Sequence, residues 1–248
     1  MSSTVLRKAY ERWTSRRVPP SEGVAQVQEE LELGVLLGIP SEAVEDYATL
    51  ASRVELLMGN EVHRTVVVGA AGRGAGASTI AIGLASTLAA TTGAPILLVD
   101  ANLRQPSLHR RFRVPRDPGL TEVVRGGMPL AEAVHPTAVP QLSLVTGGGE
   151  VKAPQSFYQL PAFRELLDAW SRQYAYVILD SAPFGGVADP AILAQQTSGA
   201  ILVLEAARTV REAAVEMTED LRRSGVRVLG AVLNRRRFYV PEWIYRRV

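Results

Sequence analysis

A glycine-rich stretch, residues 69–79, has the frame of a phosphate-binding loop. It reads Gly-Ala-Ala-Gly-Arg-Gly-Ala-Gly-Ala-Ser-Thr and follows an apolar run. Glycines let backbone N–H groups turn toward an anion, and the start of a following helix adds partial positive charge. The pattern G-x-x-x-x-G-K-[ST] requires lysine directly before Ser78, where this chain has Ala77. The stretch therefore predicts a phosphate site without the ammonium group that contacts the β- and γ-phosphates.

Two aspartates close apolar runs that have the composition of buried strands. Asp100 follows Ile-Leu-Leu-Val, and Asp180 follows Tyr-Val-Ile-Leu. One such aspartate is often only a turn residue. Two of them, together with the loop, favour a Mg-nucleotide site, because ligands bind at the carboxyl ends of the strands in open α/β sheets. Hydroxyl and carboxylate oxygens are Mg²⁺ ligands, so the predicted metal-binding residues are Ser78, Asp100 and Asp180.

From residue 63 onward, strand and helix patterns alternate. This alternation predicts a doubly wound, mainly parallel α/β sheet of the P-loop NTPase type. The predicted strands are Thr65–Gly69, Pro95–Asp100, Leu142–Thr146, Tyr176–Asp180, Ala200–Leu204 and Val226–Leu233. The predicted helices are Ser78–Thr91, Phe157–Gln173, Asp189–Gln195 and Thr209–Arg223. Thr209 and Glu212 have the spacing of a capping box, and residues 104–140 are expected to form short helices over the site.

Composition predicts one large domain with two extensions. The chain is 47% hydrophobic and 21% charged, which is typical of a globular protein rather than a disordered one. We expect a helical extension over residues 1–60, whose last helix runs from about residue 39 to Met58. The nucleotide-type domain follows over residues 61–234, and a basic, aromatic tail over residues 235–248. The chain has no cysteine and no apolar run that could span a bilayer, so a cytoplasmic location is expected.

Residues 99–106, Val-Asp-Ala-Asn-Leu-Arg-Gln-Pro, resemble the second Walker motif of the bacterial tyrosine kinases. These are the cytoplasmic autokinases of capsule and exopolysaccharide export, related to the ParA and MinD ATPases. The resemblance extends from about Glu45 to Asn234 and includes Ile178–Pro183 as the Walker B strand and Gly119–Gly126. It implies ATP or ADP with Mg²⁺ as ligand and places Asn234 near the adenine. The implied nucleotide-binding residues are Gly72, Arg73, Gly74, Ala75, Gly76, Ala77, Ser78, Thr79 and Asn234.

The chain departs from this family at several functional positions. Ala77 replaces the loop lysine, and Asn102 replaces the second acid of the Asp-x-Asp motif. In the family's Glu-x-x-Arg-x-x-Arg ring-forming helix, Glu45 remains but both arginine positions hold alanine, Ala48 and Ala51. The tail offers only two phosphoacceptor candidates, Tyr239 and Tyr245.

These departures predict a pseudokinase that binds or regulates partners in polysaccharide export. Asp100 and Asp180 remain the candidates for catalysis, but neither is expected to be fully active. Nucleotide and Mg²⁺ binding is expected to be weak or lost. The expected partner is a membrane-embedded polysaccharide chain-length regulator or a related active kinase, which would bring the chain to the inner membrane. No nucleic-acid partner is expected, and a monomer or small oligomer is expected rather than a ring.

Two alternatives remain open from the sequence. The chain could be an active autokinase or ATPase in which Arg73, inside the loop, supplies the missing charge. It could also be a ParA- or MinD-like positioning ATPase. The segment 100–106 and the aromatic, basic tail disfavour the second alternative, since both suit the kinase family better.

Overall fold

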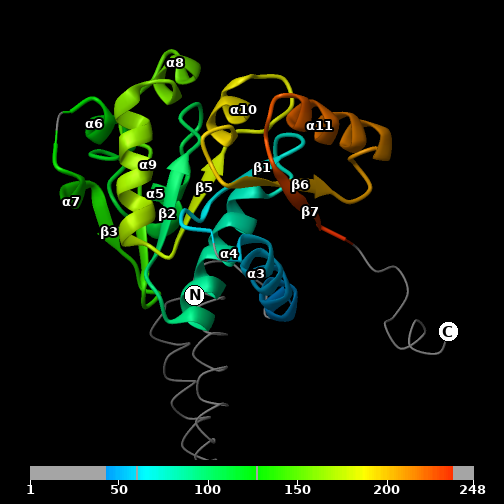
Figure 1. Cartoon of the computed structure of the whole chain (residues 1–248), viewed down its shortest axis with the longest axis horizontal. Coiled ribbons are helices and arrows are strands. Elements are labelled where there is room, and N and C mark those ends of the chain that lie inside the picture. The colour runs from blue at the N-terminus through cyan, green and yellow to red at the C-terminus, as the bar shows by residue number, and fades with distance from the viewer. Residues whose placement is uncertain (1–42, 60, 127, 237–248) are drawn as a thin grey trace, which may run out of the picture.

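A single seven-stranded sheet organises the protein (Figure 1). The computed structural model describes residues 43–59, 61–126 and 128–236. The strands are β1 (Thr65–Ala70), β2 (Ile96–Ala101), β3 (Val134–Pro136), β4 (Leu142–Val145), β5 (Tyr176–Ser181), β6 (Gly199–Glu205) and β7 (Val228–Asn234). Their order is β3-β4-β2-β5-β1-β6-β7, and every pairing is parallel except that of β3 with β4. The predicted doubly wound, mainly parallel sheet is confirmed.

Helices cover both faces of the sheet. They are α3 (Val44–Met58), α4 (Ala77–Thr92), α5 (Leu108–Phe112), α6 (Leu120–Val124), α7 (Leu130–Ala133), α8 (Pro154–Tyr158), α9 (Pro161–Gln173), α10 (Asp189–Ala194) and α11 (Arg211–Arg223). Alternate side chains of the central strands point to opposite faces, so the sheet separates two buried apolar clusters. One cluster includes side chains from α3, α4 and α5, and the other includes side chains from α6, α8, α9, α10 and α11.

The structure corrects three local predictions. The predicted helix Phe157–Gln173 is two helices, α8 and α9, because Pro161 has no N–H to donate and instead begins α9. The predicted capping box at Thr209 does not form: the Thr209 hydroxyl accepts a hydrogen bond from the Glu205 N–H (3.0 Å), and α11 has no side-chain cap. The short antiparallel edge strand β3 was not predicted, since three residues carry too little pattern.

The boundaries of the extensions lie mostly outside the described residues. Of the helices predicted for residues 1–60, only α3 (Val44–Met58) is described, and the predicted start near residue 39 lies outside the described residues. The tail beyond residue 236, with Tyr239 and Tyr245, also lies outside this part of the chain.

Helix α3 lies along α4, and a glycine permits this contact (Figure 1). A Cβ atom on Gly83 of α4 would stand 2.2 Å from the Tyr47 ring of α3. Tyr47 is buried, and its hydroxyl donates a hydrogen bond to the Thr79 carbonyl oxygen at 3.3 Å. Gly83 therefore sets how closely the two helices approach.

We expect Gly83→Val to lower the free energy of unfolding by about 1–3 kcal/mol, the usual range for overpacking a core. Gly230→Val on β7 is the matched control, because a Cβ at Gly230 meets nothing within 4 Å. Urea unfolding of both variants measures the difference. Equal stability of the two variants would show that α3 does not depend on this contact.

Candidate nucleotide site

The glycine-rich loop joins β1 to α4 at the carboxyl end of the sheet. Gly74 and Gly76 adopt φ angles of +82° and +96°, which residues with a side chain rarely adopt. Gly76 is the N-cap residue of α4, so the loop delivers its backbone directly to a helix N-terminus. The loop borders a hollow of about 250 Å³. Its lining includes residues 72–79, Asn102, Gln105, Arg111, Ser181, Pro183 and Arg235.

Asn234, at the end of β7, is hydrogen-bonded to this loop. Its side-chain amide donates a hydrogen bond to the Ala75 carbonyl oxygen at 2.7 Å. The same amide nitrogen would lie 2.3 Å from a Cβ at Gly76, so only glycine fits there without a shift. The structure thus places Asn234 against the loop, and its contact with adenine remains a prediction.

Asp100 and Asp180 lie side by side, as predicted. They are direct neighbours in the register of β2 and β5, and both are fully buried. The Asp100 carboxylate accepts hydrogen bonds from the Ser107 and Leu108 N–H groups at 2.7 and 2.8 Å, and from the Asn102 N–H at 3.3 Å. Asp100 therefore anchors the turn that leads from β2 into α5.

Asp180 has the opposite environment. Neither of its carboxylate oxygens has a hydrogen-bond partner of normal geometry among the described residues. Burial, and then the charge of Asp100, raise the pKa of Asp180 to about 8, although the facing Ser78 hydroxyl and the charge of Arg111 lower it. Burial also raises the pKa of Asp100, to about 6, and the backbone N–H groups that it binds limit this rise.

This difference bears on where a cation would fit. A buried carboxylate without a partner is costly unless a proton or a metal ion satisfies it. Asp180, which faces the Ser78 hydroxyl, is such a carboxylate, whereas the oxygens of Asp100 are already engaged by backbone N–H groups. No group of three or more histidine, aspartate or glutamate side chains in the described segments could hold a metal ion on its own. Any Mg²⁺ here would need oxygens from a nucleotide or water.

An ion pair between the exposed Arg104 and the buried Asp189 supports the same edge of the sheet. Arg104, after β2, donates to both carboxylate oxygens of Asp189 at the start of α10, at 2.5 and 2.9 Å. Burial would raise the pKa of Asp189, but the bonds from Arg104 outweigh it and hold the pKa below its usual value. This pair ties the turn after β2 to α10 across the site.

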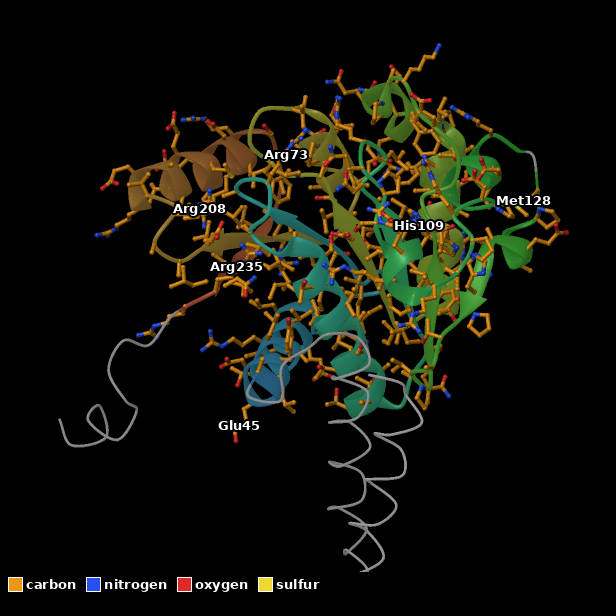
Figure 2. All side chains as sticks on the ribbon, turned by 180° about the vertical axis from the view of Figure 1, so that it is seen from behind. Glu45, Arg73, His109, Met128, Arg208 and Arg235 are labelled. Carbon is orange, nitrogen blue, oxygen red and sulfur yellow. The ribbon has the colours of Figure 1, made fainter. Side chains whose placement is uncertain are left out.

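The positions that the resemblance aligns with a ring-forming helix lie on α3. Glu45, labelled in Figure 2, and Ala48 are exposed, whereas Ala51 is buried against α4. Sequence reasoning missed Gln105, Arg111 and Arg235 as neighbours of the loop. Gln105 belongs to the motif of residues 99–106 but was not assigned to the site, whereas no motif contains Arg111 or Arg235, and the fold alone brings these two to the hollow. Arg73 and Arg235 are exposed at its margin (Figure 2).

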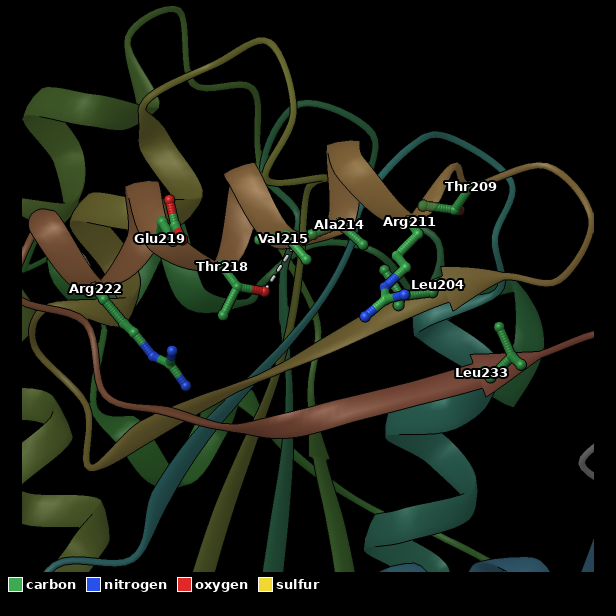
Figure 3. Close-up of a pocket in the computed structure, with 9 residues that line it drawn as sticks. All are labelled: Leu204, Thr209, Arg211, Ala214, Val215, Thr218, Glu219, Arg222 and Leu233. Atoms are coloured by element: carbon green, nitrogen blue, oxygen red, sulfur yellow. Dashed lines mark hydrogen bonds between the residues drawn. The ribbon is translucent and has the colours of Figure 1, made fainter.

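A second hollow, of about 420 Å³, lies between α11 and the strands β6 and β7 (Figure 3). Much of its lining is apolar and includes Leu204, Val215 and Leu233. Its lining contains no glycine-rich turn and no paired carboxylates, so it lacks the features that mark the first hollow as a phosphate site. No helix in the described part of the chain is long and apolar enough to cross a membrane.

The parallel sheet, the glycine-rich loop before α4 and the aspartates at adjacent strand ends define a protein of the P-loop NTPase class. The class agrees with the similarity to MinD of Pyrococcus horikoshii, whose fold matches with a TM-score of 0.59 at 18% identity, over 75% of this chain and 76% of that chain. No family model matches the chain.

Sequence relatives narrow the class. The chain is 30% identical to tyrosine-protein kinase YwqD of Bacillus subtilis, over 77% of this chain and 80% of that protein. It is 30% identical to tyrosine-protein kinase CpsD of Streptococcus agalactiae, over 75% and 80%. The VpsO kinase domain matches with a TM-score of 0.70 at 26% identity, over 87% of this chain and 98% of that domain. The chain belongs to the bacterial tyrosine-kinase family.

Other relatives are much longer than this chain. The match to the putative tyrosine-protein kinase EpsB of Ralstonia nicotianae is 30% identical over 77% of this chain but spans only 25% of that protein. The chain therefore spans about a quarter of the length of this relative.

Proposed function

We propose that this chain is a catalytically degenerate tyrosine-kinase homologue that binds nucleotide weakly and regulates capsule or exopolysaccharide synthesis through its partners. The observation that carries the proposal is Ala77 at the lysine position of an otherwise formed loop. Phosphoryl transfer depends on positive charge aimed at the migrating group. The methyl group of Ala77 supplies none, and Asn102 removes a carboxylate that the resemblance associates with the same site.

The remaining groups suit binding better than transfer. Backbone N–H groups of residues 74–79 and the start of α4 would hold the phosphates. Ser78 and Asp180 would hold Mg²⁺, which when bound neutralises phosphate charge. The loop's bond to Asn234 and the Asp100-anchored turn keep this cradle in shape without ligand.

An active kinase is the second candidate function. The observation in its favour is Arg73, which lies within the loop and borders the hollow. Arginine binds phosphate well, but Arg73 is exposed and lies four residues before Ala77, so it would reach the phosphates along a different path.

ATP hydrolysis and autophosphorylation distinguish the degenerate homologue from the active kinase. We expect purified protein to bind ADP or ATP measurably by calorimetry in the presence of Mg²⁺, and to show neither ATP hydrolysis nor autophosphorylation above a no-enzyme blank. Asp180→Ala is the control for contaminating ATPases. Turnover that survives purification, disappears in Asp180→Ala and falls sharply in Arg73→Ala would establish the active kinase instead.

We also propose that the partner is a membrane-embedded chain-length regulator or an active kinase of the same fold. Its contact would involve the basic, aromatic tail, residues 235–248. Co-purification with the regulator tests this contact, using full-length chains and chains that end at Asn234. Undiminished binding after truncation would exclude the tail from the interface.

We expect the purified protein to be a monomer or small oligomer. Light scattering measures the oligomeric state, and a stable ring would contradict this expectation.

A further inference from the structure

One arginine outside every recognised motif reaches the phosphate hollow. Arg111 lies on α5, the short helix after the turn that Asp100 anchors. Leu108 of the same helix is fully buried in the cluster beneath α4, and Phe112 packs partly against that cluster. These contacts fix α5 on the α4 face of the sheet, and Arg111 lines the hollow together with the loop.

The charge of Arg111 falls near the first turn of α4. It lowers the pKa of Asp180, which faces Ser78, and opposes the rise that burial imposes on the pKa of Tyr47. The Tyr47 hydroxyl bonds the Thr79 carbonyl oxygen, so both groups adjoin the turn that begins at Ala77. Arg111 forms no salt bridge with any residue that the structure describes, so its five donors remain available for a ligand.

The other arginines near the loop are less well placed to bind a phosphate group in the hollow. Arg235 pairs with Glu205 at 3.0 Å, beyond the end of β7. Arg110 precedes Arg111 on α5, but its charge acts on Asp100 and it does not line the hollow. Arg73 also lines the hollow and is exposed, as Arg111 is, but it lies on the loop itself four residues before Ala77.

We infer that Arg111 replaces the missing loop lysine as the side-chain cation for the terminal phosphate of a bound nucleotide. The inference rests on the proposed function, because it requires that the hollow bind nucleotide. A guanidinium can bind two phosphate oxygens through paired N–H donors, so it restores affinity that Ala77 lacks. It approaches from α5 and not from the loop.

Calorimetric titration with ADP and Mg²⁺ tests this role. We expect Arg111→Gln to weaken binding by about tenfold or more, in line with the loss of one charge-assisted contact, while the adjacent Arg110→Gln stays within about twofold. Arg111→Lys keeps a positive charge and should recover part of the affinity, which separates loss of charge from misfolding. Thermal unfolding of each variant shows whether the fold is retained.

A double-mutant cycle of Arg111→Gln with Ala77→Lys distinguishes a contact with the phosphate from a merely structural role of Arg111. If Arg111 and an introduced lysine serve the same phosphate, Arg111→Gln should weaken binding less in the Ala77→Lys background than in the natural chain. If the Arg111→Gln and Arg110→Gln variants of the natural chain bind ADP equally well, the inference is overturned and the proposed function remains intact. If the natural chain binds no ADP, both are overturned.

Discussion

Ala77→Lys should tighten ADP and ATP binding by at least about tenfold, the largest functional effect expected of any single change in this chain. Residue 77 opens α4 directly after Gly76, and its side chain borders the hollow. A lysine there would project its ammonium group toward the phosphates, as the P-loop pattern requires. One charge-assisted contact is worth about 1.5–3 kcal/mol, which corresponds to tenfold or more in the dissociation constant. Calorimetry with Mg²⁺ measures the change.

The matched control is Ala77→Met, which adds similar length without charge. If methionine tightens binding as much as lysine does, packing rather than charge explains the effect. If lysine has no effect, the loss of function extends beyond residue 77. ATP hydrolysis gained by the lysine variant would confine the catalytic loss to this one position.

Asp180→Asn should reduce the pH dependence of stability in the absence of Mg²⁺. Burial and the charge of Asp100 raise the pKa of Asp180 from its ordinary value of 3.8 to about 8 in the folded state. A raised carboxyl pKa means that the folded state holds its proton more tightly, so the stability it contributes is present at low pH. That stability is lost as pH rises from about 4 through about 8.

Each pKa unit is worth about 1.4 kcal/mol, so we expect the asparagine variant to exceed the natural chain by about 2 kcal/mol or more near pH 8. The two proteins should have similar stability near pH 4. Urea unfolding at pH 5, 6.5 and 8 measures the slope. Asp168→Asn, at an exposed position on α9, is the control. A slope that is the same in all three proteins would mean that Asp180 ionises without penalty.

The fold could be read from the sequence because its signals are local. Long apolar runs ending in Asp100 and Asp180, and glycines before a small-residue run, are each contained within a few neighbouring residues. The parallel direction of most strands follows from the alternation of strands and helices, and the structure confirms it. The errors were also local: Pro161 divides a helix that the apolar spacing predicted as continuous, and the Thr209 hydroxyl bonds Glu205 instead of capping α11.

The sequence by itself determined the class of site and the loss of its lysine, since residue types and short spacings specify both. Only the tertiary structure distinguished the two aspartates. Asp100 is engaged by N–H groups of a turn several residues later in the chain, whereas Asp180 faces the Ser78 hydroxyl but has no hydrogen-bond partner of normal geometry in the described structure. Only the tertiary structure also placed Arg111 beside the loop and showed that Asn234, which the resemblance assigns to the nucleotide site, bonds the loop itself. Both meet the loop through packing between distant segments, and such contacts leave no periodic pattern along the chain.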